Sequence, residues 1–382
     1  MREFRHPWSR MARASVVLAV AIAAAACDAD AGSDETAPAV AEDDSGSATD
    51  SNGAAEGGDT YIALCPEGEG PDSLVFSVWG GHDAELGDAV QGFTDLTGVE
   101  IEFLVNGTGD RLTKLNAERG APTIDVALVP VNEVFPLLDN GVVMAEDTSV
   151  PNYESLEDVA KVAGGYGVSQ LQLVLAYNPE HVTEEPTSWM DLFDDAYRGH
   201  IQFPTVPSVG GYGALAVINE ALGGDVDNLT PAIEQLAEAK DGIVDFYDFG
   251  PANYPLVESG EVWMYPEISG VVQQYADGGG SLEYVVPDEG GPVGMNVAVV
   301  PEGVASEGCA KAFVGWLLDE DVQTTYSQTR YYQTVNTTVD IPDEVAEFVY
   351  PVDASTVFDV DWETIQSNAA DIIDQWNRMI AN

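Results

Sequence analysis

Two short stretches of the sequence carry side chains that could recognise a ligand. Trp79 ends an apolar run before two glycines, so its indole could stack on a solute or over a cation, contributing up to ~2 kcal/mol when desolvated. Ser208 precedes Val209-Gly210-Gly211 at the start of an expected helix, where free N–H groups and the helix dipole favour an anion. These residue types predict binding of a small polar solute.

The sequence gives less support for a metal site or a catalytic site than for a solute-binding site. The histidines are scattered, and no Cys-x-x-Cys pair occurs, so we predict no metal site. Neither a nucleophile elbow, a phosphate-binding Gly-x-x-x-x-Gly-Lys loop nor a Gly-x-Gly-x-x-Gly fingerprint is present. We therefore predict no catalytic residue and no cofactor. A secreted lipoprotein hydrolase remains the alternative of another class, since spacing cannot exclude paired carboxylates in so acidic a chain.

The charge balance narrows the possible partners. The 382 residues include 13 Lys and Arg against 66 Asp and Glu, a formal net charge of -53. So negative a surface repels phosphate backbones, which excludes direct binding of nucleic acid. The acids are spread evenly, as in surfaces adapted to concentrated salt, and this diffuse excess says nothing about the ligand.

The first 60 residues differ from the rest. Four arginines precede the apolar stretch 14–26, which is too short to span a membrane and is typical of an export signal over residues 1–26. Ala24-Ala25-Ala26-Cys27 resembles a bacterial lipobox, so Cys27 is expected to carry lipid. Residues 27–60 are acidic and small, which predicts a solvated tether to a membrane anchor.

The remaining two cysteines predict a covalent link. If Cys27 carries lipid, Cys65 and Cys309 are left as a pair that outside the cytoplasm would tend to oxidise. A disulfide between them could stabilise the fold by roughly 2 to 4 kcal/mol. Two buried free thiols are the alternative.

From residue 61 onward, short β-rich runs alternate with helical segments. This alternation predicts an α/β fold with mostly parallel sheets. The expected strands cover residues 74–78, 99–105, 123–129, 171–177, 201–203, 244–246, 262–264, 282–286 and 297–300. The expected helices cover residues 84–97, 132–139, 189–193, 212–222, 230–239, 254–259, 309–318, 321–328 and 362–380.

Five stretches resemble a known family in their order along the chain. They are Trp-Gly-Gly at 79–81 with Thr97-Gly98-Val99, then 122–126, 187–193 with 197–199, 250–262, and 288–301. The chain resembles bacterial extracellular solute-binding proteins of ABC importers, in the branch that contains spermidine/putrescine-binding and ferric-ion-binding proteins. The resemblance implies a two-lobed periplasmic-binding-protein fold with a ligand cleft.

The resemblance also implies where the chain crosses between lobes. The first lobe would hold residues 61–169 plus 297–328, and the second would hold 173–292 plus 333–382. Crossings are expected near Gln170, Gly294 and Arg330. Because ligands of open α/β sheets bind beyond the carboxyl ends of strands, the site is expected in the cleft where these crossings run.

Twelve residues are expected to contact the ligand, from strand ends, helix starts and crossings. They are Trp79, His82, Asn106, Thr108, Asn132, Ser208, Gly210, Tyr212, Glu267, Ser269, Asn296 and Tyr332.

The family resemblance leaves several solutes open. A polyamine is the solute class that the resemblance implies, and Glu267 could meet its amine. Ile268, Gly294 and Asn296 depart from the aromatic and acidic residues of polyamine binders, and Ser208 lies in an acid-free turn. A sugar phosphate or phosphonate is therefore an alternative. Ferric ion is another, because Tyr331-Tyr332 offers phenolate oxygens, although the pair lies at the third crossing and not where metal-binding relatives keep theirs.

The sequence thus predicts an exported lipoprotein that faces the periplasm or the exterior. We expect a monomer that captures one small polar solute between its lobes and delivers it to an ABC transporter permease in the membrane.

Overall fold

The structure is a computed structural model that describes residues 53–247, 254–346, 348–349 and 356–381. These belong to one compact unit, residues 51–382. The export signal, Cys27 and most of the expected tether lie outside the described residues, as do residues 250–253 of the fourth family-like stretch. No helix in the described ranges is both long enough and apolar enough to cross a membrane.

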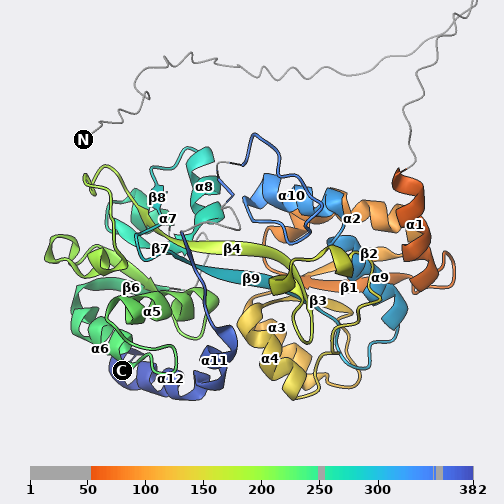
Figure 1. The fold of residues 1–382 in the computed structure, drawn as a ribbon, viewed down its shortest axis with the longest axis horizontal. Coiled ribbons are helices and arrows are strands. Elements are labelled where there is room, and N and C mark those ends of the chain that lie inside the picture. The colour runs from red at the N-terminus through yellow and green to blue at the C-terminus, as the bar shows by residue number, and fades with distance from the viewer. Residues whose placement is uncertain (1–52, 248–253, 347, 350–355, 382) are drawn as a thin grey trace, which may run out of the picture. The chain divides into compact units, whose positions relative to one another are not determined.

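A mixed sheet runs through the described unit, with the path β2-β1-β3-β9-β4-β7-β5-β6 and with β10 and β8 pairing β9 and β4 (Figure 1). Its strands are β1 (Ser73–Val78), β2 (Glu100–Val105), β3 (Val126–Pro130), β4 (Tyr166–Tyr177), β5 (Ile201–Pro204), β6 (Ile243–Tyr247), β7 (Met264–Ile268), β8 (Glu283–Val285), β9 (Gly291–Val299) and β10 (Val357–Phe358).

Strand direction differs between the ends and the middle of this sheet. β1 is parallel to β2 and β3, and β5 is parallel to β6 and β7, as βαβ connections require. β9 is antiparallel to both β3 and β4, and β4 is antiparallel to β7. The α/β class is confirmed, and the expected parallel pairing is found at both ends of the sheet, whereas the long middle strands β4 and β9 are antiparallel to each other.

Helices cover the strands of both ends. They are α1 (Gly53–Leu64), α2 (His82–Thr97), α3 (Thr108–Ala117), α4 (Val131–Asp139), α5 (Val209–Ala221), α6 (Thr230–Ala239), α7 (Tyr254–Glu258), α8 (Ser269–Asp277), α9 (Glu307–Leu317), α10 (Glu320–Arg330), α11 (Trp362–Ser367) and α12 (Ala369–Trp376). Figure 1 shows α1, α2, α9 and α10 near β1 and β2, and α5, α6 and α12 near β6.

The apolar side chains form two main cores. The first core packs β1, β3, α2 and α9 around rings such as Phe76, Phe93 and Phe313. The second core packs β5, α5, α6 and α12 around residues such as Phe203 and Trp376. A smaller cluster lies on the other face of β4 and β7.

The helix α1 begins inside the segment expected to be a tether. It is helical from Gly53, and Tyr61 near its end is buried, with its hydroxyl donating to Asp319 Oδ2 at 2.9 Å. The disulfide between Cys65 and Cys309 is confirmed, with an S–S distance of 2.00 Å. These links to the α9 region anchor a helix that composition alone did not indicate.

Several other boundaries differ from the sequence prediction. The helices α3 and α8 were not expected, and the expected helix 362–380 is divided at Asn368, which ends α11 and precedes α12. The strand expected at 262–264 lies later, as β7. The expected helix at 189–193 is a 3-10 turn that Ser188 caps.

Candidate functional site

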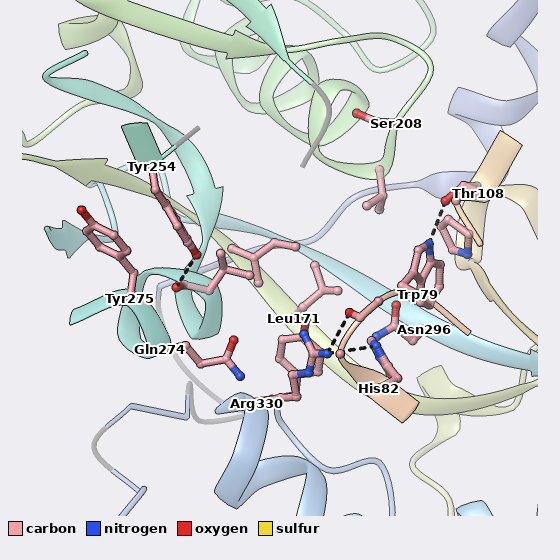
Figure 2. Close-up of a pocket in the computed structure, with 18 of the residues that line it drawn as sticks. Trp79, His82, Thr108, Leu171, Ser208, Tyr254, Gln274, Tyr275, Asn296 and Arg330 are labelled. Atoms are coloured by element: carbon pink, nitrogen blue, oxygen red, sulfur yellow. Dashed lines mark hydrogen bonds between the residues drawn. The ribbon is translucent and has the colours of Figure 1, made fainter. Parts of the chain in front are cut away.

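A cleft of ≈1470 Å³ opens between residues packed on the first core and residues at the start of α5 and on α7 and α8. Its walls include the segments that follow β1, β2, β3 and β5, where the carboxyl ends of parallel strands meet helix starts. Figure 2 shows Trp79 and Thr108 on one side of it and Tyr254 and Tyr275 on the other.

Trp79 is half-buried on the first wall and its indole is fixed from two sides. The indole Nε1 donates to Thr108 Oγ1 at 2.9 Å, which ties the end of β1 to the first turn of α3. The guanidinium carbon of Arg111 lies 4.5 Å from the ring centroid. The aromatic wall therefore has a cation stacked against it.

Arg111 is fully buried behind that wall. Its Nε donates to Ser77 Oγ at 2.8 Å, Nη1 to Leu128 O and Nη2 to Asn106 O, both at 2.9 Å. Among the described residues no carboxylate lies within ion-pair distance of it. Burial lowers the pKa of Arg111 to about 10, so the group keeps its positive charge at neutral pH.

His82 and Arg330 form a second polar group on the same wall. Arg330 pairs with Glu85 through Nε, and its Nη2 lies 3.1 Å from His82 Nδ1. Because a guanidinium can only donate, Nδ1 is the acceptor and the ring proton is on Nε2. Burial, Arg330 and Arg111 lower the pKa of His82 well below its usual value, which keeps the imidazole neutral.

The opposite wall begins at the N-terminus of α5. Ser208 is the cap residue: its hydroxyl accepts from Gly211 N at 2.9 Å and donates to Thr205 O at 2.6 Å. The cap satisfies Gly211 N, and the N–H groups of Val209 and Gly210 have no acceptor within the helix. Pro207, Ser208 and Val209 line the cleft here.

Aromatic side chains line the far end of the cleft. The rings of Tyr254 and Tyr275 are 4.2 Å apart, and Tyr275 Oη donates to Glu258 Oε1 at 3.4 Å. Gln274 lies beside them and its amide donates to Thr329 O.

Three chain segments run side by side at the base of the cleft. Gln170 in β4 pairs with Met295 in β9 and exchanges backbone hydrogen bonds with Gln333. Asn296 donates to Ser169 Oγ at 3.1 Å. After Gln333 the chain stays with the first core for a few residues, since Glu157 N donates to Val335 O.

Comparison with known proteins identifies the family. The family model described as bacterial extracellular solute-binding protein matches residues 88–349. The chain belongs to this family. Its members bind solutes outside the cytoplasm, so the chain is an exported or periplasmic substrate-binding protein of an ABC transporter.

Solved structures of such proteins share the fold of this solute-binding protein. An ABC transporter protein from Clostridium perfringens has a TM-score of 0.68 and 21% identity, covering 80% of this chain and 99% of its own. The binding protein AfuA from Actinobacillus pleuropneumoniae, with fructose-6-phosphate bound, has 0.70 and 21%, covering 81% and 99%. A chain described as a spermidine/putrescine ABC transporter from Listeria monocytogenes has 0.65 and 16%, covering 80% and 99%. At these identities the similarity shows the fold alone.

Eight of the residues expected to contact the solute line the cleft of this solute-binding protein. They are Trp79, His82, Asn106, Thr108, Asn132, Ser208, Asn296 and Tyr332. Segments far apart in sequence thus converge on one space.

Four expected contacts do not line the cleft. Gly210 and Tyr212 turn inward with α5, and Tyr212 is only 1% exposed. Ser269 is buried at the start of α8. Glu267 is fully buried in β7, where alternation brings the next residue, Ile268, to the cleft wall.

Burial also changes the chemistry of Glu267. Its Oε1 accepts from Ile268 N at 2.9 Å, and its Oε2 has no partner among the described residues. Desolvation raises the pKa of Glu267 to about 8. The group is a protonated carboxyl at neutral pH, and it lies outside the cleft surface.

Sequence reasoning missed Arg111, Arg330, Glu133 and the pair Tyr254 and Tyr275 as parts of the site. For Arg330 the sequence predicted a nearby crossing between lobes and no contact with the solute. One available signal was scarcity, because an arginine in so acidic a chain is an unusual choice.

The structure offers little to a metal ion. In the described ranges no group of three or more His, Cys, Asp or Glu side chains could hold one. Of the tyrosine pair, only Tyr332 lines the cleft, while the Tyr331 hydroxyl donates to Asp277 on α8.

Proposed function

We propose that this protein captures one small polar solute in the cleft between its two cores and delivers it to the permease of an ABC importer. The observation that carries the proposal is the convergence of eight expected contact residues, from strand ends, the start of α5 and the crossings, on one open space. Aromatic and amide side chains such as Trp79, Tyr254 and Gln274 line the cleft, as is usual for solute-binding sites.

Capture is proposed to occur by closure of the two lobes. The cleft volume of ≈1470 Å³ exceeds the 300 to 1,000 Å³ that is typical of small-molecule sites. A small solute can touch both walls only if the lobes approach. Rotation would occur at the three adjacent segments near Gln170, Asn296 and Gln333, and the solute would shift the open–closed equilibrium by its higher affinity for the closed form.

Anchoring completes the proposed role. Cys27 would carry lipid, and the acidic residues that follow would act as a solvated tether to the membrane. The folded unit would then act as a monomer near its permease, where closure presents one surface formed from both lobes.

The test combines a ligand screen with a measurement of closure. Polyamines, sugar phosphates, phosphonates, thiamine and ferric citrate are added in high salt while the melting temperature is recorded. A solute at 100 times its Kd should stabilise the folded form by about 2.7 kcal/mol. Small-angle X-ray scattering should show a smaller radius of gyration with the same solute. Turnover of a glycoside or ester panel, lost on changing one carboxylate, would instead support a hydrolase.

A further inference from the structure

We propose that the solute carries an anionic group, a carboxylate or a phosphate, which binds at the end of the cleft formed by Trp79, His82 and the first turn of α3. This inference rests on the proposed function and specifies the solute class. It departs from the polyamine that the family resemblance implies.

The first support is the uncompensated charge of Arg111. Its guanidinium is completely buried, its three hydrogen bonds go to neutral oxygens, and no described carboxylate pairs with it. A buried charge without a counter-charge costs several kcal/mol of desolvation, which an anion in front of the wall would offset. The cost is notable in a chain with 66 acids available.

The second support is the state of the Trp79 ring. An indole attracts a ligand ammonium through the negative potential of its faces. Here Arg111 already lies over the ring at 4.5 Å, so a second cation on the ring would meet both a depleted potential and the repulsion of the first. The aromatic wall therefore disfavours a polyamine and suits an anion or the C–H face of a sugar.

The third support is an unused donor. His82 lines the cleft and is only 3% exposed, its Nδ1 is occupied by Arg330, and its Nε2 has no partner in the described part of the chain. An unsatisfied buried N–H costs about 1 to 3 kcal/mol. A ligand oxygen would satisfy it.

Further donors surround the same place. Arg111 Nε donates to Ser77 Oγ, which in turn donates to Asn106 Oδ1 at 2.9 Å. Because Asn106 Oδ1 already accepts a hydrogen bond, the amide nitrogen of Asn106 is the polar atom that remains for a ligand. The first N–H groups of α3, which Gly107 caps without a side chain, lie alongside.

Three acidic residues also line the cleft near this end: Glu85, Asp110 and Glu133. Glu85 is paired with Arg330, and Asn132 donates to Glu133, whose pKa burial raises. Asp110 is exposed, so water screens its charge about fourfold more than that of a buried group. Because Arg330 and Glu85 offset each other, Arg111 is left as the cation without a counter-charge behind the wall.

The test compares probes of different charge, of which fructose and fructose 6-phosphate differ by the phosphate group alone. Fructose 6-phosphate, fructose and gluconate are compared with spermidine by calorimetry and thermal shift in high salt. We expect the phosphate or the carboxylate to bind, and this pair distinguishes the two anionic sources. Preferred binding of fructose or spermidine would overturn the inference and leave solute capture intact. Failure of every probe here and in the wider screen would count against both.

A variant locates the anion. His82→Asn keeps an oxygen near Nδ1 for Arg330 but removes the Nε2 donor, and should weaken anion binding about 10- to 100-fold. His181→Asn makes the same change at an exposed histidine that does not line the cleft; it is the matched control and should change anion binding less than threefold. Equal losses in both variants, or none in His82→Asn with an unchanged melting temperature, would refute the placement.

Discussion

Reduction of the Cys65–Cys309 disulfide tests how the N-terminal helix is held. The link closes a loop with a sequence separation of 244, and the chain-entropy relation for such a loop gives about 5.5 kcal/mol at 25 °C. This exceeds the range expected from the sequence because the loop is so long. The disulfide stabilises the fold mainly by lowering the conformational entropy of the unfolded chain.

The expected shift in melting temperature follows from the size of the folded part. About 330 residues with an unfolding entropy of ~2.1 cal/mol/K each give about 0.7 kcal/mol per kelvin. A loss of about 5.5 kcal/mol should therefore lower the melting temperature by ~8 °C. Calorimetry of the oxidised and reduced protein measures this without any change of side chain.

A double variant provides the control. Cys65→Ala with Cys309→Ala should melt near the temperature of the reduced protein and should not respond to reductant. Tyr61 would still hold α1, through its bonds to Asp319 and Asn152, so native packing is expected to survive. A fall of less than ~2 °C on reduction would refute the entropy argument.

Three further changes test the crossings, the buried carboxyl and the aromatic wall. Gly270→Ala should lower the melting temperature strongly, because its Cβ would lie 2.0 Å from Arg330 O, whereas Gly87→Ala, with open space around it, should raise stability by about 0.5 to 1 kcal/mol. The folded-state pKa of Glu267 is raised to about 8, so the contribution of its protonated carboxyl to stability is complete below pH 4.5 and is lost as the pH rises towards 8. Denaturant titrations should show a loss on the order of 4 kcal/mol in the unchanged protein and no such loss in Glu267→Gln. Trp79→Ala should weaken solute binding at least ~10-fold by calorimetry with little loss of stability, and an unchanged Kd would remove it from the site.

Local pattern was enough to predict most strands and helices of the two ends, with the exception of α1, α3 and α8. The apolar run before Trp79 and the helix ending at Gly98 were both anticipated, because period and glycine position are local signals. The middle strands were predicted too short. Residues such as Ser169 and Gln170 are polar and favour a loop reading, yet they are buried in β4 because Asn296 and Gln333 bond to them from distant segments.

The missed helix α3 has a similar explanation. Gly107 and Gly109 at its start are poor helix formers, and the helix is fixed by tertiary contacts of Arg111 and Thr108. The candidate site was therefore predictable at strand ends, where chain position alone indicates a cleft. The roles of Arg111 and Glu267 were not predictable, because they depend on the burial of these side chains in the folded protein.

The proposed binding of an anion by a chain of net charge -53 requires that the charges of the surface and of the cleft wall act over different distances. Charges exposed to salt water are screened beyond about 8 Å at physiological ionic strength and about 3 Å at 1 M. Arg111 is not exposed, so salt weakens its field at the cleft wall far less. Concentrated salt would therefore suppress the repulsion that an approaching anion meets while leaving the attraction at the wall. An acidic exterior and a buried arginine behind the cleft wall are compatible for this reason, because a buried charge acts more strongly than one on the surface.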